Sequence, residues 1–440
     1  MTASHVRLPL FLFCLLCLSA LVPARAELQI DITKGVTDPI GLAIVPFSRS
    51  VPADAGLDVA AIVQRDLESS GRFQGMDRKD MPATPSRGPD VVQADWRALR
   101  NDYLVVGRVV PANAGEVGIE YELINLLNGQ KLLDQRVSVA PASLRYGAHR
   151  VADAIFEKIT GIAGAFATRI AYVSVDGAAP AQRYQLLLAD ADGENQRVIL
   201  ESPQPIMSPA WSPDGQWLAY VSFENRGSAV FVQRVRTGER RQVSARTGIN
   251  GAPSWSPDGT KLALTLSGSS GNLDVFVLDL GTQGLTRLTE DAAIDTEPTW
   301  SPDGRSIYFT SDRAGGPQVY RIAAQGGDSP RRVSFGVPYA SRPRLSPDGT
   351  QLAMAVRDGG GYRIAVLDLA SNQLRVLTRG TLDESPSFAP NGAQLIYAAR
   401  ERGQGVLQMV SVDGQVTQRL KADRGNVREP VWGPFSQPVR

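Results

Sequence analysis

One pattern constrains the fold of this chain more than any other: a five-residue motif that returns at steps of 43 to 45 residues. Trp211-Ser212-Pro213-Asp214-Gly215 returns unchanged at 255–259 and 300–304, in altered form at 345–349 and 388–392, and as a fragment at 432–434. A fixed period of this length indicates six equivalent structural units. A proline also stands two positions before the leading residue of every copy: Pro209, Pro253, Pro298, Pro343, Pro386 and Pro430.

Each unit has the pattern of a small antiparallel sheet. The proline, aspartate and glycine of the motif suit a tight turn between two strands. Apolar runs follow the turn, at 217–221 and 230–235 in the first full unit, and a short fourth segment ends each unit. Four strands in about 44 residues is the size of a propeller blade. We therefore expect a six-bladed β-propeller over residues 169–440.

The first and last units are incomplete in complementary ways. Residues 170–174, 184–189 and 197–200 supply three strands with no motif before them, whereas 429–432 supply one strand with no others after it. We therefore expect the ring to close by placing the C-terminal strand in the first blade. A proline cannot donate to a β-ladder, so the row of prolines fits inner strands that border the central channel.

Residues 1–26 have the pattern of a secretory signal peptide. Arg7 precedes an apolar run at 8–22, and the small-residue pattern Ala24-Arg25-Ala26 follows it. The run is short for a membrane span and no similar run occurs later, so we expect no membrane span in the mature chain. An uncleaved anchor is the alternative.

Removal of this leader would leave little reactive chemistry. Cys14, Cys17 and His5 leave with it, so the mature chain has no cysteine and His149 as its only histidine. This argues against disulfides, thiol nucleophiles and most zinc or triad hydrolase sites. The loss of Arg7 and Arg25 leaves 44 basic residues against 45 acidic ones. Because the net charge is close to zero, we expect no nucleic-acid partner.

Residues 27–168 lack the repeat and are expected to form a separate α+β domain. Apolar spacing predicts helices at 57–69 and 142–160. Strands are expected at 39–47, 103–110, 116–127 and 131–139, the last two joined by an Asn128-Gly129 hairpin. His149 lies in the second helix, and we interpret it as a packed or surface histidine rather than a general base.

The residues just before the six prolines should ring one mouth of the channel. Glu297 and Glu429 in this ring could bind a cation or act as the carboxylate pair of a glycosidase. A solvated rim of mixed charge is the simpler interpretation, and we expect no catalytic residue, cofactor or metal. The full ring consists of Ser208, Ala252, Glu297, Arg342, Ser385 and Glu429.

With the leader, the small first domain and the six blades, the chain resembles the TolB family, periplasmic components of the Tol-Pal system of Gram-negative bacteria. Four stretches carry the resemblance beyond the blade motif itself. They are 39–47 (PIGLAIVPF), 250–253 (NGAP), 296–300 (TEPTW) and 382–386 (LDESP).

The resemblance implies a non-enzymatic periplasmic adaptor, monomeric and without cofactor. Such proteins bind the lipoprotein Pal at the propeller mouth and TolA through the N-terminal segment, and they support outer-membrane integrity and invagination at cell division. Ile249 stands where a histidine is familiar in the family, so a polar contact there is absent or replaced. The expected Pal contacts are Asn250, Ala252, Thr296, Glu297, Arg342, Asp383 and Glu384.

The expected TolA contact is the new N-terminus, which alternates polar and apolar residues as a half-buried strand does. It could pack on its own domain or pair with the edge of another protein's sheet. A periplasmic propeller enzyme or glycan-binding module remains the alternative to an adaptor. The segment consists of Glu27, Leu28, Gln29, Ile30, Asp31, Ile32 and Thr33.

Overall fold

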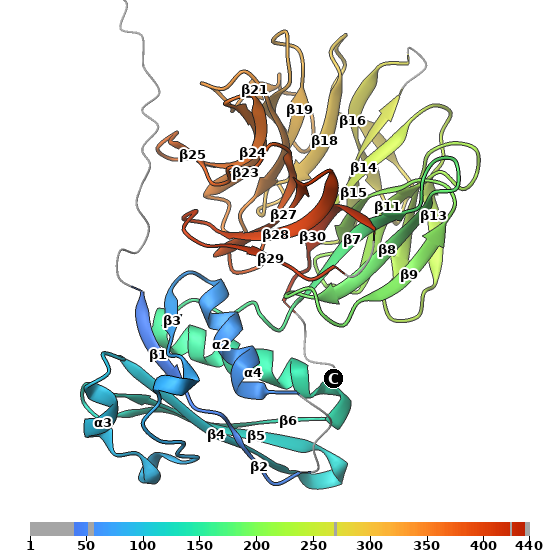
Figure 1. The fold of residues 1–440 in the computed structure, drawn as a ribbon. Helices are drawn as coiled ribbons and strands as arrows, with labels where there is room; N and C mark the ends of the chain where they lie inside the picture. Colours follow the sequence, from blue (N-terminus) through green and yellow to red (C-terminus); the bar gives the residue numbers. More distant parts are fainter. Residues whose placement is uncertain (1–38, 52–56, 268–270, 423–424, 436–440) are drawn as a thin grey trace, which may run out of the picture.

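The computed structural model describes residues 39–51, 57–267, 271–422 and 425–435. Within them the chain forms a small α+β domain and a six-bladed β-propeller (Figure 1), which confirms the expected fold class. The described part contains no helix that is long and apolar enough to span a membrane. The predicted leader and residues 27–33 lie outside the described residues.

The first domain is a mixed sheet with helices α2 and α4 on the face toward the propeller (Figure 1). The strand order is β3-β1-β4-β5-β6, with β2 also pairing with β4, and β4, β5 and β6 form an antiparallel meander. The strands are β1 (Ile40–Ile44), β2 (Ser48–Arg49), β3 (Phe73–Gly75), β4 (Tyr103–Pro111), β5 (Val117–Asn125) and β6 (Lys131–Val139). The helices are α2 (Val59–Ser69), α3 (Gln93–Arg97) and α4 (Leu144–Thr160).

The two long helices form where the apolar spacing predicted them. Asp58 caps α2 by accepting a hydrogen bond from the Ala61 N–H at 3.0 Å, which satisfies one free donor of the first turn. Gly161 ends α4 with a φ of 72°, a left-handed conformation that favours glycine. The apolar faces of both helices pack on the sheet and form one core with it.

The propeller consists of six four-stranded antiparallel sheets, each running from an inner to an outer strand. Blade two consists of β10 (Ile206–Trp211), β11 (Trp217–Ser222), β12 (Ala229–Arg234) and β13 (Arg240–Ser244). Blade three consists of β14 (Asn250–Trp255), β15 (Lys261–Ser267), β16 (Leu273–Asp279) and β17 (Leu285–Arg287). Blade four consists of β18 (Asp295–Trp300), β19 (Ser306–Ser311), β20 (Gln318–Ala323) and β21 (Arg331–Arg332). Blade five consists of β22 (Ala340–Leu345), β23 (Gln351–Asp358), β24 (Gly361–Asp368) and β25 (Leu374–Val376). Blade six consists of β26 (Asp383–Phe388), β27 (Gln394–Glu401), β28 (Gln404–Ser411) and β29 (Thr417–Arg419).

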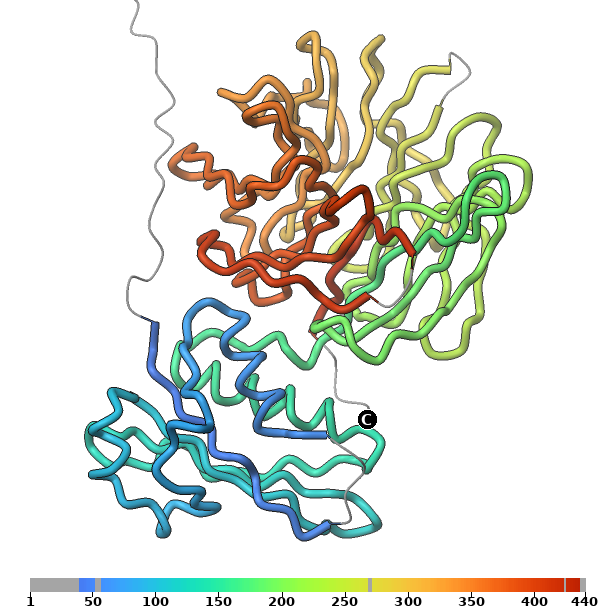
Figure 2. The backbone as a smooth tube through the Cα atoms, viewed as in Figure 1, coloured from blue at the N-terminus to red at the C-terminus, as the bar shows by residue number. Residues whose placement is uncertain are grey.

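Blade one combines segments from opposite ends of the propeller sequence. Its strands are β30 (Asn426–Trp432), β7 (Arg169–Asp176), β8 (Arg183–Asp190) and β9 (Arg197–Ser202), in that order from the channel outward. β30 pairs with β7, and the red C-terminal trace lies beside the green trace of blade one in Figure 2. Ring closure of this kind leaves no inner strand without a sheet partner among the described residues.

The serine and aspartate of the repeated motif hold its turn. In blade two, Ser212 Oγ donates to Asp214 Oδ1 at 2.5 Å and accepts the Trp217 N–H at 2.9 Å. Asp214 Oδ1 also accepts the Gln216 N–H at 3.0 Å, and Gly215 has a φ of 67°. The motif therefore specifies a closed network of hydrogen bonds between the first two strands of a blade.

The tryptophan of the motif joins neighbouring blades. The indole N–H of Trp255 donates to the Ala210 carbonyl of the preceding blade at 3.1 Å, and that of Trp300 donates to the Ser254 carbonyl at 3.2 Å. Trp211 reaches Val431 of the C-terminal strand in the same way, at 3.3 Å. Each of these three indole N–H groups thus finds its acceptor in the sheet that precedes it around the ring.

Candidate functional site

The row of residues before the six prolines has an unusual backbone. All six are non-glycine residues with φ between 45° and 56°, in the left-handed region. Such a conformation costs about 1–3 kcal/mol per residue and is retained only where the surrounding structure requires it. The row consists of Ser208, Ala252, Glu297, Arg342, Ser385 and Glu429.

A break in the inner strand explains this backbone. In blade four, Thr296 pairs with Thr310 but Thr299 pairs with Tyr308, so the register shifts across Glu297 and Pro298. The same shift occurs at the matching position of every other inner strand. Proline cannot donate to the ladder, and the bulge removes the need for that donor.

This row lines a cavity of about 240 Å³ at the end of the channel where the inner strands begin, which we call the mouth. Arg342 forms the centre of its charge network. Its Nε lies 3.2 Å from Glu297 Oε1, and its terminal nitrogen lies 3.7 Å from Glu429 Oε1 and 3.9 Å from Glu384 Oε2. Glu297 Oε2 also accepts the Arg342 N–H at 2.9 Å.

The three carboxylates of the mouth therefore converge on one guanidinium. Burial would lower the pKa of Arg342, but Glu297, Glu429 and Glu384 outweigh it and raise that pKa. The sequence suggested that Glu297 and Glu429 could bind a cation. In the structure Arg342 of the same ring is the cation that lies between them. Glu297 and Glu429 are therefore each paired with a cation of the chain itself.

Most of the expected Pal contacts line the mouth, and two of the seven are buried. Asn250, Ala252, Thr296, Glu297 and Arg342 line the mouth cavity, and Glu384 adjoins it through Arg342. Asn250 and Asp383, however, are almost fully buried.

These two buried residues hold the loops of the mouth. The Asn250 side-chain oxygen accepts the Arg246 N–H at 2.9 Å, and an Asp383 oxygen accepts the Gly380 N–H at 3.1 Å. Through these bonds the two side chains set the shape of the loops at the mouth.

Apolar side chains surround the same mouth. Ile249 is 50% exposed, Met207 is 40% exposed, and both line the cavity. Ile294 holds the position in blade four that Ile249 holds in blade three, directly before the inner strand, and it is 47% exposed. Exposed apolar side chains gathered at one place are a feature of surfaces that bind another protein.

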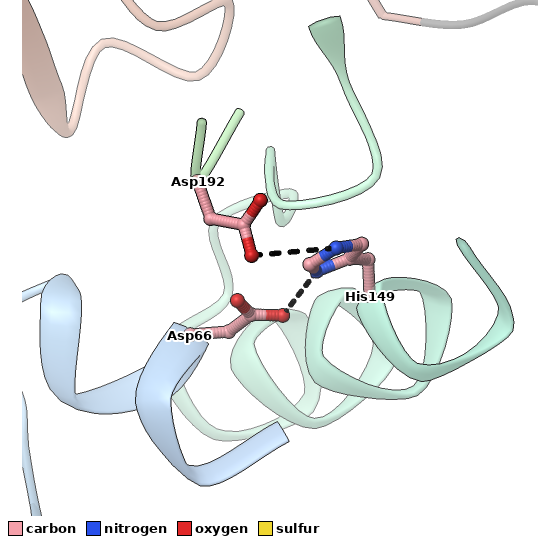
Figure 3. Close-up of side chains that lie close together, drawn as sticks. All are labelled: Asp66, His149 and Asp192. Atoms are coloured by element: carbon pink, nitrogen blue, oxygen red, sulfur yellow. Dashed lines mark hydrogen bonds and ion pairs between the residues drawn. The ribbon is translucent and has the colours of Figure 1, made fainter. Parts of the chain in front are cut away.

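A second group of charged residues lies between the two domains. His149 of α4 is 1% exposed, and its Nδ1 lies 2.6 Å from Asp66 Oδ2 of α2 (Figure 3). Its Nε2 faces Asp192 of the propeller, with 3.8 Å between Nε2 and Oδ2. Arg145, one turn earlier in α4, also forms an ion pair with Asp192. Arg145 also lies 3.9 Å from Asp190, so the carboxylates of Asp66, Asp190 and Asp192 surround His149 and Arg145 inside the interface.

The charges of this group favour an ionised histidine. Burial alone would lower the pKa of His149, but the adjacent Asp66 carboxylate, with Asp192 and Asp190 beyond it, raises that pKa to about 9. Asp66, His149 and Asp192 each offer an atom within 4.8 Å of the others, close enough for a metal site. We interpret the group as an ion-pair cluster, because Asp66 already engages the imidazole and Arg145 already neutralises Asp192.

Further polar contacts fix the two domains on each other around this cluster. Gln394 of the propeller donates to the Ser69 carbonyl at 2.7 Å, and Asn391 donates to the Ala163 carbonyl at 3.0 Å. Asp153 of α4 accepts the Phe166 and Ala167 N–H groups of the connecting segment. Burial raises the pKa of Asp153 to about 6.

Comparison with known proteins decides the family. Residues 28–132 match the model of the TolB amino-terminal domain, and residues 156–436 match that of the TolB beta propeller domain. The chain belongs to the TolB family. The Tol-Pal system protein TolB of Thioalkalivibrio sulfidiphilus is 49% identical over 98% of each chain, and that of Xylella fastidiosa is 46% identical over 95% of each.

A solved relative has the same architecture. The crystal structure of TolB from Acinetobacter baumannii is 40% identical, with a TM-score of 0.83 over 90% of this chain and 97% of that one. Both domains of this TolB family chain are therefore matched in sequence and in structure. The family membership places the chain in the Tol-Pal system.

Proposed function

We propose that this chain is a non-enzymatic periplasmic adaptor of the Tol-Pal system. It binds Pal at the propeller mouth and TolA through residues 27–33. By joining these partners it supports outer-membrane integrity and the invagination of the outer membrane at division.

The mouth is the observation that carries this proposal. Its strained row of residues, its shared Arg342 and its exposed Ile249 and Met207 combine a fixed polar centre with apolar contact area. That combination suits a protein partner, in which buried apolar anchors supply affinity and rim charges supply specificity and association rate. The isoleucine at position 249 replaces a polar contact by an apolar one.

Two observations support a role without catalysis. His149 forms a buried ion pair at the domain interface and is not among the residues that line the mouth. Glu297 is occupied by a backbone donor and by Arg342. Turnover of a peptide or glycoside that disappears in Glu297→Gln or Glu429→Gln would contradict this part of the proposal.

The direct test is calorimetric titration of the mature chain, residues 27–440, with the soluble periplasmic domain of Pal and, separately, with that of TolA. We expect one-to-one binding of each partner. A well-folded chain that binds neither domain would overturn the proposed function.

A further inference from the structure

The channel contains a second cavity, at the end opposite the mouth, where the repeated turns lie. Its volume is also about 240 Å³. Its walls come from the motif positions of five blades, including Trp211, Trp255, Trp300 and Phe388, with the turn prolines at its rim. We call it the turn-end cavity.

The indoles of this cavity offer surface rather than hydrogen bonds. Each of the three indole N–H groups already donates to a backbone carbonyl of a neighbouring blade. Ser387 Oγ accepts the backbone N–H of Trp432 at 2.9 Å. The walls are thus preformed and largely apolar, the usual character of a small-molecule site.

Arg344 is the only charged residue among the described residues that line this cavity. It lies in β22 two positions after Arg342 and also borders the mouth cavity, so it stands between the two. The one hydrogen bond of its side chain among the described residues joins a terminal nitrogen to the Pro343 carbonyl at 2.8 Å, and no described carboxylate lies within ion-pair distance. Most of its five donors therefore remain available.

The surroundings leave this charge only partly compensated. Enclosure in the channel lowers the pKa of Arg344, and Glu297 and Glu429 offset that effect only in part. These two glutamates and Glu384 are engaged by Arg342 instead. An arginine still carries its charge at neutral pH, and a partly desolvated charge is most stable when an anion pairs with it.

We propose that the turn-end cavity binds a small carboxylate that carries an aromatic or apolar body. The carboxylate pairs with the Arg344 guanidinium, whose planar donors match two carboxylate oxygens. The body packs against the indoles and Phe388. The site rests on residues of the turn-end cavity and not on the proposed function, although Arg344 also borders the mouth.

The test uses 3-phenylpropionate and its neutral amide as matched probes of the mature chain. We expect the acid to bind about tenfold more tightly than the amide, the effect of one charge-assisted pair. Arg344→Gln should abolish this preference, Arg344→Lys should retain part of it, and Arg241→Gln, on the exposed outer strand of blade two, should leave it unchanged. An acid preference that survives in Arg344→Gln would overturn the proposal.

Two further measurements complete the test. Acetyl-Ala-Ala-Phe with a free or amidated C-terminus distinguishes a peptide end from a free acid as the ligand. The indole N–H resonances of Trp211, Trp255 and Trp300 should shift when 3-phenylpropionate is added to the unmodified protein. This measurement uses the unmodified protein, so it does not depend on whether a variant folds. The absence of any shift of these resonances at saturating 3-phenylpropionate would also overturn the proposal.

Discussion

Deleting residues 27–33 is expected to abolish TolA binding and leave Pal binding largely intact. The segment alternates polar and apolar residues, with Leu28, Ile30 and Ile32 on one side of an extended chain. A strand of this kind can add to the edge of a partner's sheet through backbone hydrogen bonds, while one row of side chains fills pockets. Removing the strand removes the whole contact. Calorimetric titration of the deleted and intact mature chains measures the effect.

The alternation provides a matched control for this deletion. Leu28→Asp combined with Ile30→Asp should also abolish TolA binding, because both changes place charge in the apolar row that the proposed contact would bury. Gln29→Ala combined with Asp31→Ala should weaken it little. If Pal binding changes TolA affinity, TolA must change Pal affinity by the same factor. Unchanged TolA affinity in the deleted chain would refute the assignment of this segment.

Replacing His149 by alanine should lower the free energy of unfolding by about 3–5 kcal/mol, the cost of breaking a buried ion pair by removal of one partner. Asp66 is 4% exposed and would lose the imidazolium 2.6 Å away. Urea unfolding followed by circular dichroism measures the loss. Adding Asp66→Asn to His149→Ala should restore part of the stability, because it removes the unpaired carboxylate. Strict additivity of the two changes would contradict a direct pairing.

The same pair predicts a dependence on pH. The pKa of His149 is about 9 in the folded chain, above the value of about 6.5 expected when unfolded. The stabilisation is therefore complete below about pH 6.5 and is lost as the pH rises through about 9. The stability difference between the unmodified chain and His149→Gln should shrink over this range. A difference that stays constant would show that the imidazole is neutral throughout.

The repeat made the propeller predictable because its motif specifies local hydrogen bonds. Ser212 and Asp214 close their turn within six residues, and proline and glycine restrict the backbone there. The two long helices of the first domain were predictable from apolar spacing for the same local reason. The short strands β2 and β3 and the five-residue helix α3 could not be predicted, because so short a segment shows no periodic spacing of apolar residues.

The site was only partly predictable, because its chemistry depends on residues far apart in the sequence. The row of residues before the prolines could be listed from the repeat, but their left-handed backbone and the sharing of Arg342 by three glutamates could not. His149 was singled out as the last histidine, yet its partner Asp66 lies 83 residues away. Only the packing of α2 on α4 brings the two together.

The most direct test of the adaptor account measures Pal binding to Ile249→Asp. Ile249 is half exposed at the mouth, and Val198 is 44% exposed on β9, the outer strand of blade one. Ile249→Asp removes an apolar side chain that Pal would cover and places a charge in the contact, so it should weaken Pal binding at least about tenfold, whereas Val198→Asp should leave binding unchanged. TolA binding should be retained in both variants. Unchanged Pal affinity in a folded Ile249→Asp chain would contradict the account.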